Sequence, residues 1–428
     1  MENSPPILRK AYFIGIGGIG MSALAQLLAD HGVFVAGSDR EASPVTDLLE
    51  EKGIPVIIGQ DGSGVPPDAD VVVYSEAVWE DNPERVRAKE LGISQKSYFT
   101  VLGEVSSGKK TIAVAGTHGK TTTTGMLARI LRDAGAEPSA VVGSLVRDFN
   151  SNYLSGTSDL LVVEACEYKR DFLTLMPSVL VITNIEFDHT DYYRDLADVQ
   201  SAFAELIGKV PADGAIVTDA LHPNIAPLLV GVAPRVIDYT QEAEYFVKLP
   251  GEFNMMNARA AAAAATFVLP DIGQETLKES LAAFSGTWRR FEYKGKSQNG
   301  ADVYDDYAHH PTAVRKTVAE LRERTHGKLV IAFHPHLYSR TRDLLDDFST
   351  AFHGADQVLI APIYAAREAN DGTVSSALLA ERITANGTLA EALSFEEIAT
   401  RLAEAGKGDV VVTMGAGDIY KVADALVA

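Results

Sequence analysis

The sequence predicts an α/β protein of three consecutive domains, each built on a mostly parallel sheet. Short apolar segments typical of buried strands alternate with amphipathic segments typical of helices along the whole chain. This alternation restarts near residues 104 and 286, and 428 residues are too many for one hydrophobic core. We therefore expect a Rossmann-like domain at 1–103, a central P-loop ATPase-like domain at 104–285 and a Rossmann-like α/β domain at 286–428.

Composition narrows the classes of function. Hydrophobic residues make up 46% and charged residues 22% of the chain, which is typical of a globular protein. A net charge of −20 argues against a nucleic-acid partner. One cysteine, Cys166, excludes an internal disulfide. No apolar run reaches the roughly 18 residues of a membrane span, and residues 1–10 lack the apolar core of an export signal, so we expect a cytoplasmic protein without membrane insertion.

The first domain is expected to alternate strand and helix from its start. Its predicted strands are 11–17, 33–39, 54–59 and 70–78, and its predicted helices are 21–32 and 45–53. A glycine-rich loop joins the first strand to the first helix, with Gly15, Gly17, Gly18 and Gly20, and Asp39 follows Gly20 by 19 residues. This spacing is the dinucleotide-binding fingerprint. The same loop accepts any diphosphate, so the pattern alone leaves a nicotinamide cofactor and another nucleotide open.

A second glycine-rich loop opens the central domain. Strand 110–115 runs into it, a helix with apolar Met126, Leu127 and Ile130 follows it, and its residues are Gly116, Thr117, His118, Gly119, Lys120 and Thr121. Backbone amides and a helix N-terminus bind phosphate, the lysine neutralises phosphate charge, and the threonine hydroxyl binds Mg²⁺. Val114 stands where the full pattern has glycine, so the loop is a shortened form.

Two buried strands, predicted at 158–168 and 178–189, bring polar residues to the same sheet edge. Glu164 lies at the carboxyl end of the apolar part of the first segment, and Asn184, Asp188, His189 and Asp191 lie beyond the apolar part of the second. Ligands of open parallel sheets gather at carboxyl ends of strands, and such side chains suit Mg²⁺ or Mn²⁺. We interpret Cys166 as a packing residue, because no partner base is evident.

The rest of the chain continues the α/β pattern. The alanine-rich segment 254–269 predicts a helix that closes the central domain. The third domain has predicted strands at 301–311, 328–335, 357–366 and 409–418.

Ten motifs occur along the chain in a characteristic order: GIGGIGMSALA, YSEAV, GTHGKTTTT, VVEACEY, TNIEFDHTDYY, PGEFNMMNARAA, RRFEYKG, DDYAHHPTAV, HPHLYSRTRDL and MGAGDI. Together they resemble the Mur ligases of peptidoglycan synthesis, most closely the branch that adds L-alanine. The resemblance covers nearly the whole chain. It implies ATP-dependent ligation of L-alanine to the lactyl carboxylate of UDP-N-acetylmuramate through an acyl phosphate, with Mg²⁺ or Mn²⁺, in cell-wall biogenesis.

The resemblance also implies roles for individual residues. Catalysis is expected from Lys120, His189, His309 and Arg340. Nucleotide binding is expected from the loop residues 116–122, which end at Thr122, and from Asn254, Asn257 and Asp306. Substrate binding is expected from Gly15, Gly17, Gly18, Gly20, Asp39, Ser75, Tyr307, His309, His336 and Arg340. The metal ligands are expected to be Thr121, Glu164 and His189.

The chain departs from the family pattern at several positions. Phe253 replaces a histidine, Leu337 replaces an arginine of some relatives, and the segment 239–249 is short. No lysine lies between residues 191 and 208, which fits the alanine-adding branch. Two alternatives stay open: a ligase that joins a tripeptide to the same sugar, and, in another class, a nicotinamide-dependent oxidoreductase with an ATPase module. As a lesser alternative for the third domain, the HHP motif only caps a helix.

Overall fold

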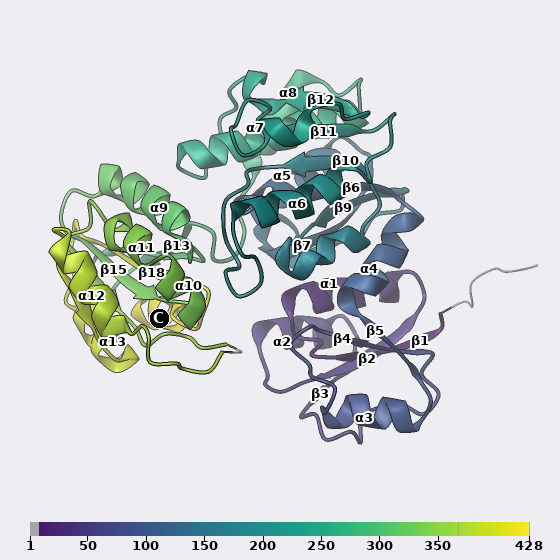
Figure 1. The fold of residues 1–428 in the computed structure, drawn as a ribbon, viewed down its shortest axis with the longest axis horizontal. Coiled ribbons are helices and arrows are strands. Elements are labelled where there is room, and N and C mark those ends of the chain that lie inside the picture. The colour runs from purple at the N-terminus through teal and green to yellow at the C-terminus, as the bar shows by residue number, and fades with distance from the viewer. Residues whose placement is uncertain (1–7, 367, 428) are drawn as a thin grey trace, which may run out of the picture. The chain divides into compact units, whose positions relative to one another are not determined.

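The computed structural model describes residues 8–366 and 368–427 (Figure 1). Residues 1–7, part of the segment in which we expect no export signal, lie outside this range. The described residues form two compact units: residues 8–185, 200–246 and 257–285 make the first, and residues 186–199, 247–256, 286–366 and 368–427 make the second. Within the described residues, no helix has the length and apolarity needed to cross a membrane.

The first unit contains a five-stranded parallel sheet with the order β3-β2-β1-β4-β5. Its strands are β1 (Lys10–Ile14), β2 (Phe34–Asp39), β3 (Val56–Ile58), β4 (Val71–Tyr74) and β5 (Ser94–Ser97). Its helices are α1 (Ile19–Asp30), α2 (Pro44–Glu51), α3 (Pro83–Glu90) and α4 (Tyr98–Ser107). The four predicted strands and two predicted helices are confirmed. The sequence reasoning missed β5 because this edge strand is polar and has no apolar run.

The first unit also contains a seven-stranded sheet with the order β12-β11-β10-β6-β9-β7-β8. Its strands are β6 (Lys110–Ala115), β7 (Ser139–Val146), β8 (Ser151–Leu154), β9 (Leu160–Glu164), β10 (Pro177–Ile182), β11 (Ala215–Thr218) and β12 (Arg235–Asp238). The chain also forms α5 (Lys120–Asp133), α6 (Leu196–Ile207), α7 (Glu252–Val268), α8 (Gln274–Ala283) and the 3₁₀ helices η1 (Arg147–Phe149), η2 (Tyr168–Thr174), η3 (Ala226–Leu229) and η4 (Tyr239–Gln241). All strand pairs are parallel except β7–β8.

Strand β6 is central to this second sheet, since it pairs with β9 on one side and β10 on the other. Its residues Ile112, Ala113, Val114 and Ala115 are buried, which explains the continuous apolar run. The three carboxyl ends of β9, β6 and β10 therefore lie side by side and carry the polar residues expected there. The segments 186–199 and 247–256 fall inside the predicted central domain but pack in the second unit, so the domain limits stay a prediction.

The second unit is built on a six-stranded sheet with the order β13-β14-β18-β15-β16-β17, in which only the β13–β14 pair is antiparallel. Its strands are β13 (Glu292–Lys296), β14 (Asp302–Asp306), β15 (Leu329–His334), β16 (Gln357–Ile360), β17 (Ala390–Ala392) and β18 (Val410–Gly415). Its helices are α9 (Pro311–Arg324), α10 (Tyr338–Asp343), α11 (Leu345–Ala351), α12 (Ser376–Ala385), α13 (Phe395–Ala403) and α14 (Tyr420–Val427). The four predicted strands of this region are confirmed.

Both faces of this sheet are covered, and the strand sequences follow from that. Along β15, Ile331 and Phe333 pack into a core with helices α9, α11 and α12. The alternate residues Val330 and Ala332 pack into a second core with α13 and α14. A strand covered on both faces needs apolar residues at every position, which is why no alternation marks β15. The α/β class with three sheets is thus confirmed.

Candidate active site

The first glycine loop connects β1 to α1 as expected, and its acidic partner closes it. The backbone N–H of Gly17 donates to Asp39 Oδ2 at 2.8 Å. Gly15 adopts a positive φ of 81°, and a Cβ built there would lie 3.4 Å from Ser75 Oγ. A Cβ on Gly17 would lie 2.8 Å from the Asp39 carboxylate. The structure therefore brings Gly15, Gly17, Asp39 and Ser75 together at the carboxyl ends of β1, β2 and β4, and their contact with a substrate stays a prediction.

The second loop needs its two glycines for steric reasons. Gly116 and Gly119 have φ angles of 133° and 84°, which favour glycine. A Cβ on Gly116 would collide with Thr183 Oγ1, and one on Gly119 with Asn257 Oδ1. Position 114, where the full pattern has glycine, is occupied by Val114. This residue belongs to β6, where it is paired with β9 and fully buried, so the loop begins only after it.

Asn184 holds the second loop through three hydrogen bonds. Its carbonyl oxygen accepts from the N–H of Thr117 at 3.1 Å, and its side-chain oxygen accepts from the N–H of His118 at 2.9 Å. Its side-chain amide donates to the carbonyl of His118 at 2.9 Å. Asn184 follows β10 directly, so this neighbouring strand fixes the shape of the loop. The sequence reasoning noted Asn184 only as a metal-site candidate.

Lys120, the first residue of α5, points back over the loop. Its Nζ donates to the carbonyls of Gly116 at 2.5 Å and Thr117 at 3.3 Å, and pairs with a Glu167 carboxylate oxygen at 2.9 Å. Burial disfavours the charged lysine, but the nearby anionic groups, Glu167 foremost, together outweigh burial and raise the pKa of Lys120. The sequence reasoning missed Glu167; the signal was a second carboxylate three residues after Glu164.

Thr121 and Glu164, two of the predicted metal ligands, contact each other. The Thr121 hydroxyl donates to Glu164 Oε1 at 2.9 Å, and the N–H of Gly143 donates to Oε2 at 2.7 Å. A carboxylate and a hydroxyl form an oxygen donor set that fits Mg²⁺. His189 belongs to the second unit, where it has a φ of 52° and its N–H donates to Asp188 Oδ1, so its part in the metal site stays a prediction. Thr122 is buried within α5.

Cys166 is expected to react slowly with thiol reagents. Burial, followed by the Glu167 carboxylate, raises the pKa of its thiol to about 12. Because the thiolate is the reactive form, we expect alkylation at pH 8 in the presence of EDTA to be roughly tenfold or more slower than that of a small free thiol. Mass spectrometry of iodoacetamide-treated native and urea-unfolded protein measures this, and equal rates would contradict the assigned environment.

In the second unit, four predicted substrate residues form one cluster. The Tyr307 and His309 rings lie 5.3 Å apart, and the His309 and His336 rings 6.1 Å apart. Arg340 Nη1 lies 2.9 Å from His336 Nδ1, and Arg340 Nε donates to Asp188 Oδ1 at 2.7 Å. Arg340 is 1% exposed, so its guanidinium is fixed by these contacts.

Electrostatics in this cluster set the protonation states. Burial by itself would raise the pKa of Asp188. The nearby positive charge, that of the Arg340 guanidinium foremost, nevertheless holds this pKa well below its usual range. Burial, followed by the same guanidinium, holds the pKa of His309 well below its usual range. At neutral pH the cluster therefore contains a charged arginine, a charged aspartate and a neutral histidine.

The remaining nucleotide-side residues are held by internal contacts. Asp306 accepts a hydrogen bond from Thr317 Oγ1 at 2.6 Å, and burial raises its pKa. The Asn254 side chain donates to the Pro250 carbonyl at 2.7 Å. Asn257 lies against Gly119, as the glycine geometry shows. Nucleotide contacts of these three residues stay predictions.

The HHP motif does cap a helix, but through its second histidine only. The Nδ1 atom of His310 accepts from the N–H of Thr312 at 3.3 Å, at the start of α9. His309 instead joins the cluster with Tyr307 and His336. The capping alternative therefore explains His310 without removing His309 from the candidate site.

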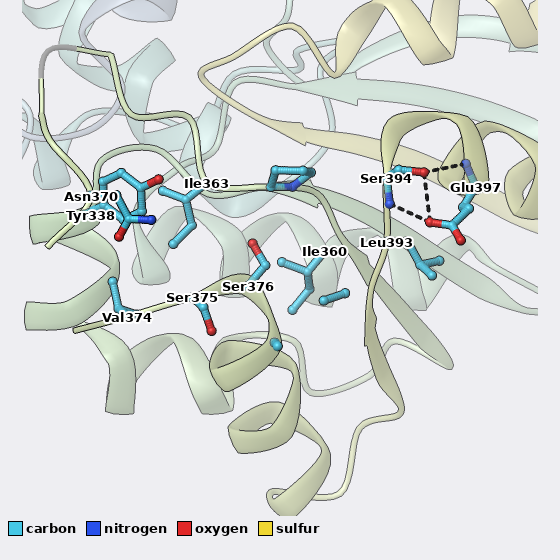
Figure 2. Close-up of a pocket in the computed structure, with 13 residues that line it drawn as sticks. Tyr338, Ile360, Ile363, Asn370, Val374, Ser375, Ser376, Leu393, Ser394 and Glu397 are labelled. Carbon is cyan, nitrogen blue, oxygen red and sulfur yellow. Dashed lines mark hydrogen bonds between the residues drawn. The ribbon is translucent and has the colours of Figure 1, made fainter. Parts of the chain in front are cut away.

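A separate pocket of about 390 Å³ lies at the carboxyl ends of β16 and β17 (Figure 2). Two of its polar side chains are hydrogen-bonded within the chain: Ser376 Oγ donates to the Ala361 carbonyl. The Glu397 carboxylate accepts from Ser394 (Figure 2). Apolar side chains such as Ile360 and Leu393 form the remaining walls. None of the predicted site residues lines this pocket.

Comparisons with known proteins agree with the three sheets. Residues 10–110 match the description "Mur ligase family, catalytic domain", residues 114–244 match "Mur ligase middle domain", and residues 289–417 match "Mur ligase, glutamate ligase domain". The three matched ranges include both glycine loops and every strand of the three sheets except residues 111–113 of β6.

Individual relatives match along their whole length. UDP-N-acetylmuramate–L-alanine ligase of Clostridium acetobutylicum is 38% identical over 98% of this chain and 97% of its own. The crystal structure of UDP-N-acetylmuramate–alanine ligase MurC from Thermotoga maritima is similar with a TM-score of 0.81 and 26% identity, covering 98% of both chains. A murein peptide ligase of Psychrobacter arcticus is similar with a TM-score of 0.75 and 25% identity, again over 98% of both chains. With these matches over nearly its full length, the chain belongs to the Mur ligase family.

Proposed function

We propose that this protein is an ATP-dependent, ADP-forming ligase that joins L-alanine to UDP-N-acetylmuramate in peptidoglycan synthesis. The observation that carries the proposal is the end-to-end similarity to an L-alanine ligase in a chain whose second loop is intact. The first loop would then hold the UDP diphosphate and the second the triphosphate of ATP. Membership of a ligase family also argues against the oxidoreductase alternative. The glycine pattern of the first loop does not oppose this conclusion, because such a loop accepts any diphosphate and needs no nicotinamide.

The reaction follows from what the groups must do. A lactyl carboxylate oxygen attacks the γ-phosphorus, the bond to the β-phosphate oxygen breaks, and ADP leaves. The alanine nitrogen then attacks the acyl carbon, and phosphate leaves with the former carboxylate oxygen. Two anions meet in the first step, so their charge must be offset, and we assign this role to Lys120 at the start of α5.

His309 is suited to take the proton that alanine must lose. Its Nδ1 lies 2.9 Å from the Tyr307 carbonyl oxygen, which can only accept, so in the neutral ring Nδ1 carries the proton. Nε2 then keeps a lone pair, and the lowered pKa keeps the ring neutral at pH 7. Arg340, held by Asp188, provides a fixed positive charge in the same cluster for an anionic group.

A divalent cation would be held by Thr121 and Glu164, with His189 as a third ligand. When bound, it would offset charge on the phosphates and polarise the γ-phosphoryl group. The two oxygen donors already share a hydrogen bond of 2.9 Å, so both side chains point to one place.

Glu164→Gln is expected to weaken the use of this metal. The amide keeps the size of the side chain but loses the charge that attracts the cation. We expect the half-saturating Mg²⁺ concentration to rise about tenfold or more. Titration of Mg²⁺ in a phosphate-release assay measures it, with Glu104→Gln, at an exposed ion pair on α4, as the matched control. An unchanged Mg²⁺ requirement would exclude Glu164 as a ligand.

Ligation of a tripeptide is the second candidate, supported by the similarity to the murein peptide ligase. Phosphate release from ATP and Mg²⁺ separates the two, with UDP-N-acetylmuramate alone, L-alanine alone, both together, or the sugar with a tripeptide. Release that requires sugar and alanine supports the proposal. Release with the tripeptide but not alanine moves the protein to the second candidate, and no release in any mixture overturns both.

A further inference from the structure

The ammonium group of Lys120 is surrounded by acceptors from its own chain. Both carboxylate oxygens of Glu167 lie within reach of Lys120 Nζ, at 2.9 and 3.2 Å. The carbonyls of Gly116 and Thr117 complete the environment at 2.5 and 3.3 Å. Four acceptor atoms thus face an ammonium group that has only three protons.

This ion pair is buried. The Glu167 side chain is 2% exposed and the Lys120 side chain 14% exposed. A buried charge is costly without its partner, so neither group gives up the other easily. A phosphate that binds Lys120 must therefore compete with Glu167 for the same ammonium.

The end of β9 supplies one carboxylate to each of two successive loop residues. Glu164 receives the hydroxyl of Thr121, while Glu167, three residues later, receives the ammonium of Lys120. The first carboxylate faces a hydroxyl and suits a metal site. The second faces a cation and neutralises it.

We propose that Glu167 is a positioning residue that holds Lys120 withdrawn over the loop and lowers nucleotide affinity so that ADP leaves after turnover. Nucleotide binding transfers the lysine from the carboxylate to the phosphates, and ADP release returns it. The inference rests on the proposed assignment of the second loop to the ATP phosphates.

Glu167→Gln tests this by removing the competing charge at constant size. Calorimetric titration with Mg-ADP, in the absence of sugar and alanine, is expected to show roughly tenfold tighter binding, the scale of one charge-assisted hydrogen bond. Steady-state kcat is expected to fall because ADP leaves more slowly. Glu104→Gln removes the carboxylate of the exposed Lys96–Glu104 pair in the same unit and is expected to leave both values unchanged.

The direction in which the Mg-ADP affinity changes distinguishes this positioning role from a merely structural one. If Glu167 only stabilises the fold, the variant melts at a lower temperature and binds Mg-ADP equally or more weakly, and the inference is overturned. If Glu167→Gln fails to fold, Glu167→Asp is used instead. Its side chain is one methylene shorter, so the carboxylate lies farther from the lysine. Tighter Mg-ADP binding is again expected there, and unchanged or weaker binding overturns the inference.

Lys120→Ala distinguishes this inference from the function on which it rests. Loss of Mg-ADP binding in Lys120→Ala, with unchanged affinity in Glu167→Gln, removes the role of Glu167 and keeps the loop assignment. Wild-type Mg-ADP affinity in Lys120→Ala would overturn the loop assignment itself.

Discussion

Lys120→Ala is expected to abolish turnover while binding of UDP-N-acetylmuramate stays largely intact. Under the proposed function Lys120 is the cation that offsets the phosphate charge, and the substitution removes it without touching the first glycine loop. Loss of a group that acts on developing charge costs about 10² to 10³ in kcat or more. A phosphate-release assay measures turnover, and calorimetry with the UDP-sugar measures binding.

The matched control is Lys110→Ala on the strand that leads into the same loop. Lys110 is 70% exposed in a surface pair with Asp159, so its removal is expected to leave turnover near the wild-type rate. If Lys120→Ala retained wild-type turnover, the second loop would not be the catalytic one.

Asp188→Asn is expected to destabilise the second unit and to disorganise the cluster around Arg340. The substitution leaves a guanidinium that is 1% exposed without its ionic partner. Removing one member of a buried pair costs about 3–5 kcal/mol. Thermal unfolding should shift to a lower temperature, and kcat should fall because Arg340 and His309 lose their fixed geometry.

The pH dependence of this pair has a definite sign. The pKa of Asp188 is lower in the folded chain than in the unfolded one, so its contribution to stability is present above about pH 4 and is lost as the pH falls toward the lowered pKa. Asp188→Asn should remove this acid-sensitive part. Asp346→Asn, at an exposed pair with Arg382, serves as control and should change stability by less than about 1 kcal/mol. Equal effects of both substitutions would contradict the assigned role of Asp188.

The sequence was most informative where the backbone conformation restricts which residue type can occupy a position. Both glycine loops, the strands that precede them and the helices that follow them were predicted, because positive φ angles and close contacts accept only glycine at Gly116 and Gly119. Strands β5, β7, β8, β11, β12, β13 and β17 were not predicted. The edge strands β5 and β17 are short and partly polar, and their strand character depends on pairing with a neighbour.

The sequence by itself determined the three-sheet α/β class, the two phosphate-type loops and the residue types that gather at the strand ends. These follow from local periodicity and from steric limits that act within a few residues. Only the tertiary structure decided which charges meet. Glu167 reaches Lys120 across 47 positions of the chain, and Asp188 reaches Arg340 across 152. Such pairs depend on strand order and packing. The residues that surround a carboxylate in the sequence do not indicate which distant cation it will pair with.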